Sequence, residues 1–291
     1  MTITQSYQVD IAEVEYLQHG DTAFLARVFR PLGTGPFPIM VELHGGAWVN
    51  GGRQDEDVPN EALAKNGIIV VALDFRVPPV ASYPASLADI HYGIRWCKTQ
   101  AAGWNGSADN VGVMGTSTGG HQSMLLGLRP NDSRYSALPL PAGSDDVDGT
   151  VGCAILVSPL TDPLGRYRYA KGLREGLTPP EGMADRVPAF HDQYWLTEEA
   201  MIEGGPARIL ASGERTSLPP MLSVAREYEA SHPRPDLDEF IVQYRKAGGE
   251  IDVTFFGDEY AGEGLLKDLS LPIADETLEV MTVFIHKHLS N

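Results

Sequence analysis

The sequence predicts an α/β fold with a mostly parallel central sheet, helices on both faces of the sheet, and an inserted cap. Strand-like and helix-like segments alternate from about residue 38 onward, which favours parallel strands joined by helical crossovers. Most of the expected strands are apolar throughout, as strands covered on both faces are. These strands span residues 39–43, 68–73, 111–114, 153–157 and 221–225. The last expected strand differs, because Ile251, Val253 and Phe255 alternate with polar residues and indicate an exposed edge.

Helical periodicity marks segments between and after these strands. The clearest apolar repeats lie in residues 87–97, 237–244 and 277–289. Residues 161–218 interrupt the alternation of strands and helices, since they contain Pro179-Pro180 and several glycines but no clear strand pattern. We therefore expect a single domain over residues 1–291, with a cap at about 161–218 that lies over the functional site.

Composition is that of an ordinary globular protein. Hydrophobic residues make up 43% of the 291 positions and charged residues 21%. The net charge of -17 disfavours binding to nucleic acid or to an anionic membrane. Cys97 and Cys153 lie in a helical and a strand pattern, so no disulfide framework is expected. Because neither a leader pattern nor a membrane-length apolar run is visible, we expect a cytoplasmic protein, with a homodimer left open.

A nucleophile motif follows the strand at residues 111–114. Gly115-Thr116-Ser117-Thr118-Gly119 comes directly after this strand and before an apolar helix, which is the context that the G-x-S-x-G motif requires. Small residues are needed on both sides of the serine, because backbone segments approach closely in such a strained turn. The motif predicts Ser117 as a nucleophile at the positive end of the following helix.

A glycine-containing loop precedes this motif by about 70 residues. His44-Gly45-Gly46-Ala47-Trp48 directly follows the strand at residues 39–43, so its glycines can turn amide groups toward a tetrahedral oxyanion. The amide of Thr118 would supply a third donor. We count Gly45, Gly46, Thr118 and Trp48 as the oxyanion-binding and substrate-binding residues.

Together these motifs resemble those of the hormone-sensitive-lipase-like and the feruloyl or acetyl-xylan esterase-like α/β hydrolases, near the kynurenine formamidases. The resemblance runs from about Val14 to the C-terminus. Besides the two motifs, its elements are Asp74-Phe75-Arg76, Tyr83-Pro84 leading to Asp89, and Leu218-Pro219-Pro220. It implies an α/β-hydrolase fold, a serine carboxylesterase without cofactor or metal, and structural roles for His44 and His121.

The resemblance also implies a catalytic carboxylate after the strand that follows Pro219-Pro220. This position falls on Glu229, with Glu227 as the alternative. Glutamate can replace the commoner aspartate, because the acid only orients the histidine and stabilises its protonated form.

The histidine base that the resemblance implies is missing from its usual place after the last strand. The loop there reads Gly257-Asp258-Glu259-Tyr260-Ala261-Gly262, so the position falls on Ala261, or on Tyr260 in the alternative register. Three explanations stay open. A histidine at 261 was replaced by alanine, or His232 has taken over as a relocated base. The third is a protein that binds without hydrolysing, as the gibberellin receptors of plants do.

Basic and aromatic residues cluster within the expected cap. The segment Arg166-Tyr167-Arg168-Tyr169-Ala170-Lys171 could hold an anionic or aromatic substrate, although such a segment is more often a solvated helix face. The leading hypothesis is a serine hydrolase that cleaves a small or medium carboxylic ester, lactone or amide through an acyl-enzyme at Ser117. The alternatives are a non-hydrolytic ligand-binding protein and a lyase or dehydratase on the same fold.

Overall fold

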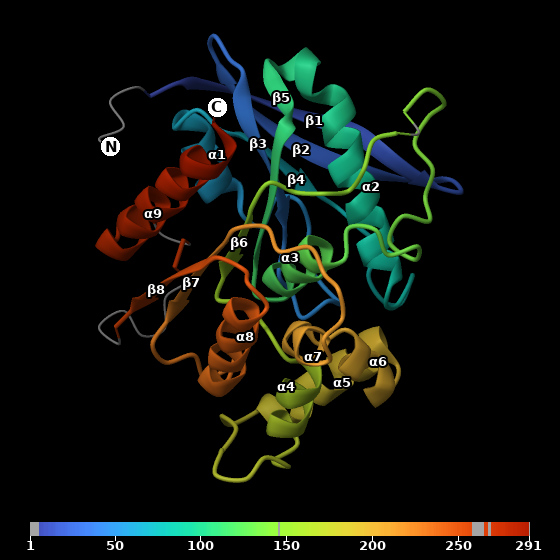
Figure 1. Ribbon diagram of the computed structural model, residues 1–291, viewed down its shortest axis with the longest axis vertical. Helices are drawn as coiled ribbons and strands as arrows, with labels where there is room; N and C mark the ends of the chain where they lie inside the picture. The colour runs from blue at the N-terminus through green and yellow to red at the C-terminus, as the bar shows by residue number, and fades with distance from the viewer. Residues whose placement is uncertain (1–5, 145, 258–264, 267–268, 291) are drawn as a thin grey trace.

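One eight-stranded sheet crosses the protein, in a computed structural model that describes residues 6–144, 146–257, 265–266 and 269–290 (Figure 1). The strand order is β1-β2-β4-β3-β5-β6-β7-β8. The strands are β1 (Gln8–His19), β2 (Thr22–Leu32), β3 (Phe37–Leu43), β4 (Ile69–Leu73), β5 (Gly106–Thr116), β6 (Ala154–Val157), β7 (Met221–Arg226) and β8 (Ile251–Phe256). Every strand expected from the sequence is present, and β8 lies at the edge as its alternating pattern predicts.

The sequence analysis assigned no strand before residue 38, where the structure has two long ones. β1 and β2 form an antiparallel hairpin, and β2 pairs antiparallel with β4. All other neighbouring strands pair in parallel. Alternation of apolar and polar residues along β1, as at Val14, Glu15 and Tyr16, and the turn at Gly20-Asp21 are signals that could have identified this hairpin.

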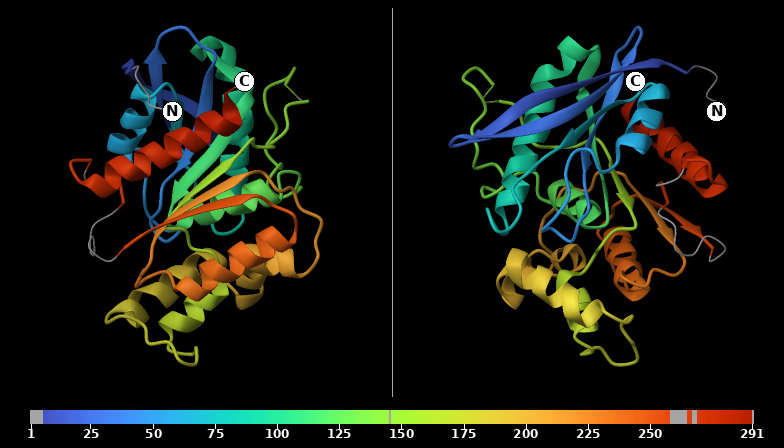
Figure 2. Two further views of the ribbon diagram at one scale, coloured as in Figure 1. Left: turned by 60° about the vertical axis from the view of Figure 1, so that its left-hand side comes forward. Right: turned by 180° about the vertical axis from the view of Figure 1, so that it is seen from behind.

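Helices cover both faces of the sheet (Figures 1 and 2). They are α1 (Asp57–Lys65), α2 (Ala85–Gln100), the short 3-10 helix η1 (Ala101–Trp104), α3 (Thr118–Leu128), α4 (Pro163–Ala170), α5 (Met183–Trp195), α6 (Glu198–Glu203), α7 (Pro206–Ala211), α8 (Arg234–Lys246) and α9 (Pro272–Leu289). The three helices expected from periodicity correspond to α2, α8 and α9. Gly248 follows α8 at a φ of +96°, a conformation that favours glycine at the end of a helix.

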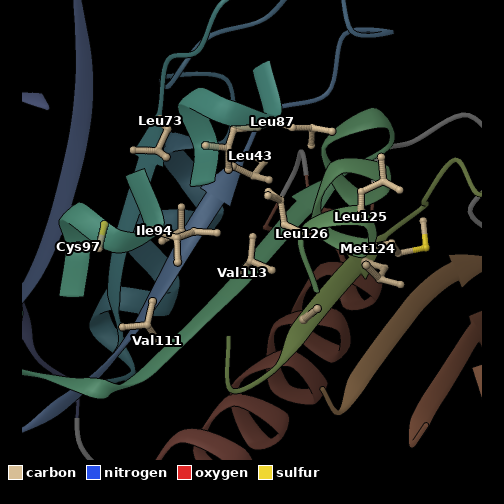
Figure 3. Packing of buried hydrophobic residues seen from close by; sticks show 14 of the residues in the cluster. Leu43, Leu73, Leu87, Ile94, Cys97, Val111, Val113, Met124, Leu125 and Leu126 are labelled. Atoms are coloured by element: carbon tan, nitrogen blue, oxygen red, sulfur yellow. The ribbon is translucent and has the colours of Figure 1, made fainter. Parts of the chain in front are cut away.

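Successive side chains of the buried strands point into two separate apolar cores. Val113 of β5 belongs to the core that includes residues of α2, α3 and α8, whereas the next residue, Met114, belongs to the core that includes residues of α1 and α9. Figure 3 shows the first core, in which Leu43 and Val113 of the sheet lie beside Ile94 of α2 and Leu126 of α3. These two cores hold the sheet rigid and thereby position the carboxyl ends of its strands.

The segment between β6 and β7 contains four helices, α4 to α7, which we call the helical cap. They gather beyond the carboxyl ends of the central strands (Figures 1 and 2). Glu203 of α6 joins the cap to the sheet domain, because it pairs with Arg129 and Arg134 and accepts a hydrogen bond from Tyr83. In the parts of the chain that the structure describes, no helix has the length and apolar character needed to cross a membrane.

Candidate active site

Ser117 occupies a sharp turn between β5 and α3. Its φ of 55° lies in the left-handed region that residues with a side chain rarely adopt. A Cβ atom on Gly119 would lie 2.0 Å from the carbonyl oxygen of Leu43, and one on Gly115 would lie 2.4 Å from the carbonyl carbon of Gly119. The turn therefore tolerates only glycine at these two positions, which explains the spacing of the G-x-S-x-G motif.

The loop that follows β3 lies against this turn. A Cβ atom on Gly45 would come within 3.5 Å of the Cβ of Ser117, so the backbone of Gly45 passes directly beside the nucleophile. Gly46 has a φ of +96°, and its carbonyl oxygen accepts hydrogen bonds from the amides of Val49 and Asn50. Thr118 is the first residue of α3, where an amide has no acceptor within its own helix. The predicted oxyanion donors thus come from two segments that meet at Ser117.

His232 is the histidine that contacts the nucleophile. Its Nε2 lies 3.2 Å from the Oγ of Ser117, and its Nδ1 lies 3.4 Å from Oε2 of Glu229. The other carboxylate oxygen of Glu229 accepts a hydrogen bond of 3.4 Å from the hydroxyl of Ser158, at the end of β6. Glu229 and His232 both belong to the loop between β7 and α8, where the amide of His232 donates to the carbonyl of Glu229. The serine, the histidine and the carboxylate therefore lie in a row, with His232 in the middle, as in a Ser-His-acid triad.

The charge states of this group suit proton transfer from the serine. Burial lowers the pKa of His232 below its ordinary value, and the charge of Arg166 adds to this effect while Glu229 opposes it. Burial would raise the pKa of Glu229, but its contact with His232 and the charge of Arg226 bring that pKa below its ordinary value. At neutral pH the imidazole can therefore accept a proton beside an ionised carboxylate.

The fold agrees with that of the known proteins that the chain resembles. Residues 28–152 match the protein family described as BD-FAE. Esterase LipC of Mycobacterium tuberculosis is 37% identical over 136 residues, which cover 45% of this chain and 34% of LipC. Carboxylic ester hydrolase LipN of the same organism is 25% identical over 270 residues, covering 91% of this chain and 67% of LipN. The match to LipC thus spans about a third of that relative's length.

Solved esterase structures share the whole architecture. Esterase Est2 of Thermogutta terrifontis, bound to butyrate, superposes with a TM-score of 0.73 at 21% identity, over 99% of this chain and 97% of Est2. The metagenomic carboxylesterase EstE1 gives a TM-score of 0.74 at 20% identity, over 99% and 92% of the two chains. This chain has the α/β-hydrolase fold. The fold inferred from its motifs is thereby confirmed, and the match over residues 28–152 agrees with the esterase resemblance.

In this α/β hydrolase, His44 is buried beneath the oxyanion loop. Its Nδ1 lies 2.9 Å from the carbonyl oxygen of Gly45, and its ring stacks on Phe75 with the ring centres 4.1 Å apart. These contacts hold the loop in place, in agreement with the structural role that the family resemblance implies.

Trp48 connects the oxyanion loop of the hydrolase to its helical cap. Its amide donates to the hydroxyl of Thr118 over 3.3 Å, and its indole, only 1% exposed, stacks on Tyr194 of α5. The indole N–H also donates to Nδ1 of His121, whose Nε2 lies 2.8 Å from the carbonyl oxygen of Gly204. His121 is therefore a packing residue. A direct contact between Trp48 and substrate stays a prediction.

The other predicted site positions of the hydrolase lie away from the triad or outside the described residues. The side chain of Glu227 is exposed, whereas that of Glu229 reaches His232. Tyr260 and Ala261, the positions of the family histidine, lie outside the described residues, and a catalytic part for either stays a prediction. Within the described ranges, no group of three or more His, Cys, Asp or Glu side chains is placed to hold a metal ion.

Sequence reasoning missed that the basic run in the hydrolase's cap is largely buried. Arg166, Tyr167 and Tyr169 face inward from α4, and only Arg168 and Lys171 of the run are exposed. The spacing of the run could have predicted this burial, because an apolar residue or an aromatic ring recurs on one face of the helix. Ser158, which supports Glu229, carried no signal that sequence reasoning could use.

Proposed function

We propose that this chain is a serine carboxylesterase that hydrolyses a small or medium ester, lactone or amide through an acyl-enzyme at Ser117. In this proposal His232 is the base and Glu229 the acid that orients it. The observation that carries the proposal is the contact of 3.2 Å between Ser117 Oγ and His232 Nε2, with Glu229 behind the histidine. A nucleophile and a base within this range, with a third group that orients the base, are what acyl transfer by a serine requires.

Hydrolysis would proceed in two halves that use the same histidine. Ser117 Oγ bonds to the carbonyl carbon while its proton passes to Nε2 of His232. The C–O bond to the alcohol then breaks, and His232 returns that proton to the leaving oxygen. A water molecule next attacks the acyl-enzyme, giving its proton to His232, and the carboxylic acid leaves as Ser117 recovers its hydrogen.

The negative charge on the carbonyl oxygen needs stabilisation in both halves of this reaction. We assign that role to the amides of Gly45, Gly46 and Thr118, which come from the two segments that meet at Ser117. Fixed amide donors around a developing oxyanion are commonly the largest single contribution to catalysis in such sites. The strained turn supports the assignment, because it holds the serine at the positive end of α3.

A protein that only bound a ligand at this site would have no use for a base in contact with Ser117. The position of His232 therefore favours the hydrolase over the non-hydrolytic binding protein, and no contact in the site favours the lyase or dehydratase. A cytoplasmic location and a homodimer are kept as predictions from the sequence.

Covalent labelling of Ser117 tests the proposed function. A fluorophosphonate ester should add one phosphonyl group per chain, on the peptide that contains Ser117, because only a serine activated by a base attacks phosphorus readily. Intact and peptide mass spectrometry measure this addition. Ser117→Ala should take up no label, whereas Ser123→Ala, which removes a buried hydroxyl of α3 bonded to the carbonyl oxygen of Gly119, should be labelled like the unaltered chain. Labelling that persists in Ser117→Ala would refute the proposal.

The pH dependence of hydrolysis should reflect the depressed pKa of His232. The base must be neutral to accept the serine proton, so kcat/KM should rise with pH and reach a plateau once His232 has lost its proton. Because burial and Arg166 lower its pKa, the midpoint should lie below the ordinary histidine value of about 6.5. A pH–rate profile with an aryl ester measures it. A midpoint above that value would contradict the assigned environment of the base.

A further inference from the structure

Arg166 of α4 carries a buried charge that no described side chain neutralises. The residue is only 7% exposed, and its Nε donates a hydrogen bond of 2.8 Å to the carbonyl oxygen of Ser231. Its Nη1 is buried without a hydrogen-bond partner, and the guanidinium forms no ion pair with any described residue. A buried guanidinium normally has a carboxylate or several acceptors, because burying an unpaired charge is costly.

The acidic side chains around α4 are already paired with other groups. Asp162, one turn before Arg166, pairs with Arg208 at 2.6 Å, and Asp236 pairs with Arg174 at 2.7 Å. Glu229 is directed at His232. None of these three carboxylates pairs with Arg166, and Arg186 adds a second positive charge near it.

Arg166 nevertheless keeps its proton at neutral pH. Burial lowers its pKa, and the charge of Arg186 lowers it further, to about 10. The guanidinium is therefore charged, desolvated and short of an acceptor, which is the state of a residue that receives an anionic ligand.

The position of Arg166 indicates which part of an ester such an anion would belong to. Arg166 donates a hydrogen bond to Ser231, which directly precedes His232, and its positive charge lowers the pKa of the His232 imidazole. In the proposed reaction His232 returns its proton to the leaving oxygen, so the alcohol part of the ester lies on the histidine side of Ser117. A cation beside His232 is therefore placed on the side of the leaving group.

We infer that Arg166 binds a carboxylate carried by the alcohol part of the substrate, so that the preferred substrates are esters of hydroxy acids. This inference rests on the proposed function and names the substrate class of the same site. The planar guanidinium can bind a carboxylate through two parallel hydrogen bonds, which adds orientation to charge pairing. An ester held in this way would place its leaving oxygen beside the imidazole that must protonate it.

A pair of matched aryl esters tests the inference. The charged substrate is para-acetoxyphenylacetate and the neutral one is para-acetoxyphenylacetamide; both release a phenol from the same acetyl ester. The unaltered chain should prefer the charged ester by about 10-fold to 100-fold in kcat/KM, the range that a charge-assisted hydrogen bond supports. In Arg166→Gln this ratio should fall to about 1, and Arg166→Lys should keep part of it.

The matched control is Arg168→Gln, which removes the same charge two residues along α4. Arg168 is exposed and pairs with Glu198, so its loss should leave the substrate ratio unchanged. A purely structural role for Arg166, in holding Ser231, would instead lower the rates with both esters equally and leave the ratio intact. That result would overturn the inference, while hydrolysis of the neutral ester that depends on Ser117 would leave the proposed function standing.

Two further measurements separate the remaining outcomes. Monophenyl adipate carries its negative charge on the acyl part, and its neutral amide is the matched uncharged ester. A preference for the charged ester that is confined to this pair would overturn the assignment to the leaving group. Calorimetry with para-hydroxyphenylacetate, the product, tests binding without turnover. Weaker binding to Arg166→Gln than to the unaltered chain supports the inference even if no ester is hydrolysed, and equal binding refutes it.

Discussion

Replacing His232 by alanine is expected to lower kcat for an aryl ester by about 10⁶-fold, the loss typical of removing the base of a serine hydrolase. Without the imidazole, no side chain of the described residues remains in contact with the Ser117 hydroxyl to accept its proton. The oxyanion donors would remain, so a residual rate of about 10³ to 10⁴ over the uncatalysed reaction should persist. Steady-state kinetics of phenol release measures both quantities.

Two control variants make this result decisive. His286→Ala removes a half-buried histidine of α9, which bonds to Ser290 and to the backbone of Asn66, and should leave kcat unchanged. Ala261→His introduces the histidine that the family resemblance implies at this position. If His232 is the base, this change should give no large gain. A chain in which His232→Ala is harmless and Ala261→His raises kcat by orders of magnitude would place the base at 261.

Glu229→Gln is expected to lower kcat by about 10⁴-fold while KM changes little. The carboxylate lies 3.4 Å from Nδ1 of His232, so it holds the ring in orientation and stabilises its protonated form during the reaction. An amide of the same shape keeps the packing but can stabilise the wrong tautomer and offers no charge. The pH–rate profile should also change, since His232 loses the contact that raises its pKa, and the midpoint should move to lower pH.

Glu227→Gln is the matched control for this prediction. Glu227 lies two residues earlier in the same loop, and its side chain is exposed. Its replacement should leave kcat and the pH–rate midpoint unchanged. Equal losses in the two variants would indicate that the loop as a whole, rather than the contact between Glu229 and His232, determines the rate.

Local pattern was sufficient to predict the sheet and the nucleophile turn. Strands such as β3 and β4 are apolar from end to end because both of their faces are covered, and this leaves a signal in a few adjacent residues. The turn at Ser117 excludes any side chain at Gly115 and Gly119, so a five-residue motif is enough to predict it. The hairpin of β1 and β2 was missed although its alternation is visible, because charged residues interrupt the apolar residues of β1 and leave no continuous apolar run.

The partners of Ser117 could not be read from local pattern in the same way. A histidine three residues after a glutamate in a loop has the sequence signature of any solvated pair. The sequence left His232 open as a relocated base. Its contact with Ser117 arises because β7 lies next to β6, and β6 next to β5, which brings the loop after β7 to the end of β5. Likewise, the position of Arg166 in a basic run predicts an exposed side chain. It is buried because α4 packs against the β7–α8 loop.

The sequence by itself determined the parallel part of the sheet, the strained serine turn and the glycine loop beside it, since each depends on sterics and burial among neighbouring residues. Only the tertiary structure decided which histidine meets Ser117 and which arginine is buried without a counter-charge. Those contacts join residues 65 and 115 positions apart, and distance and desolvation across such separations arise only when the sheet and cap have folded.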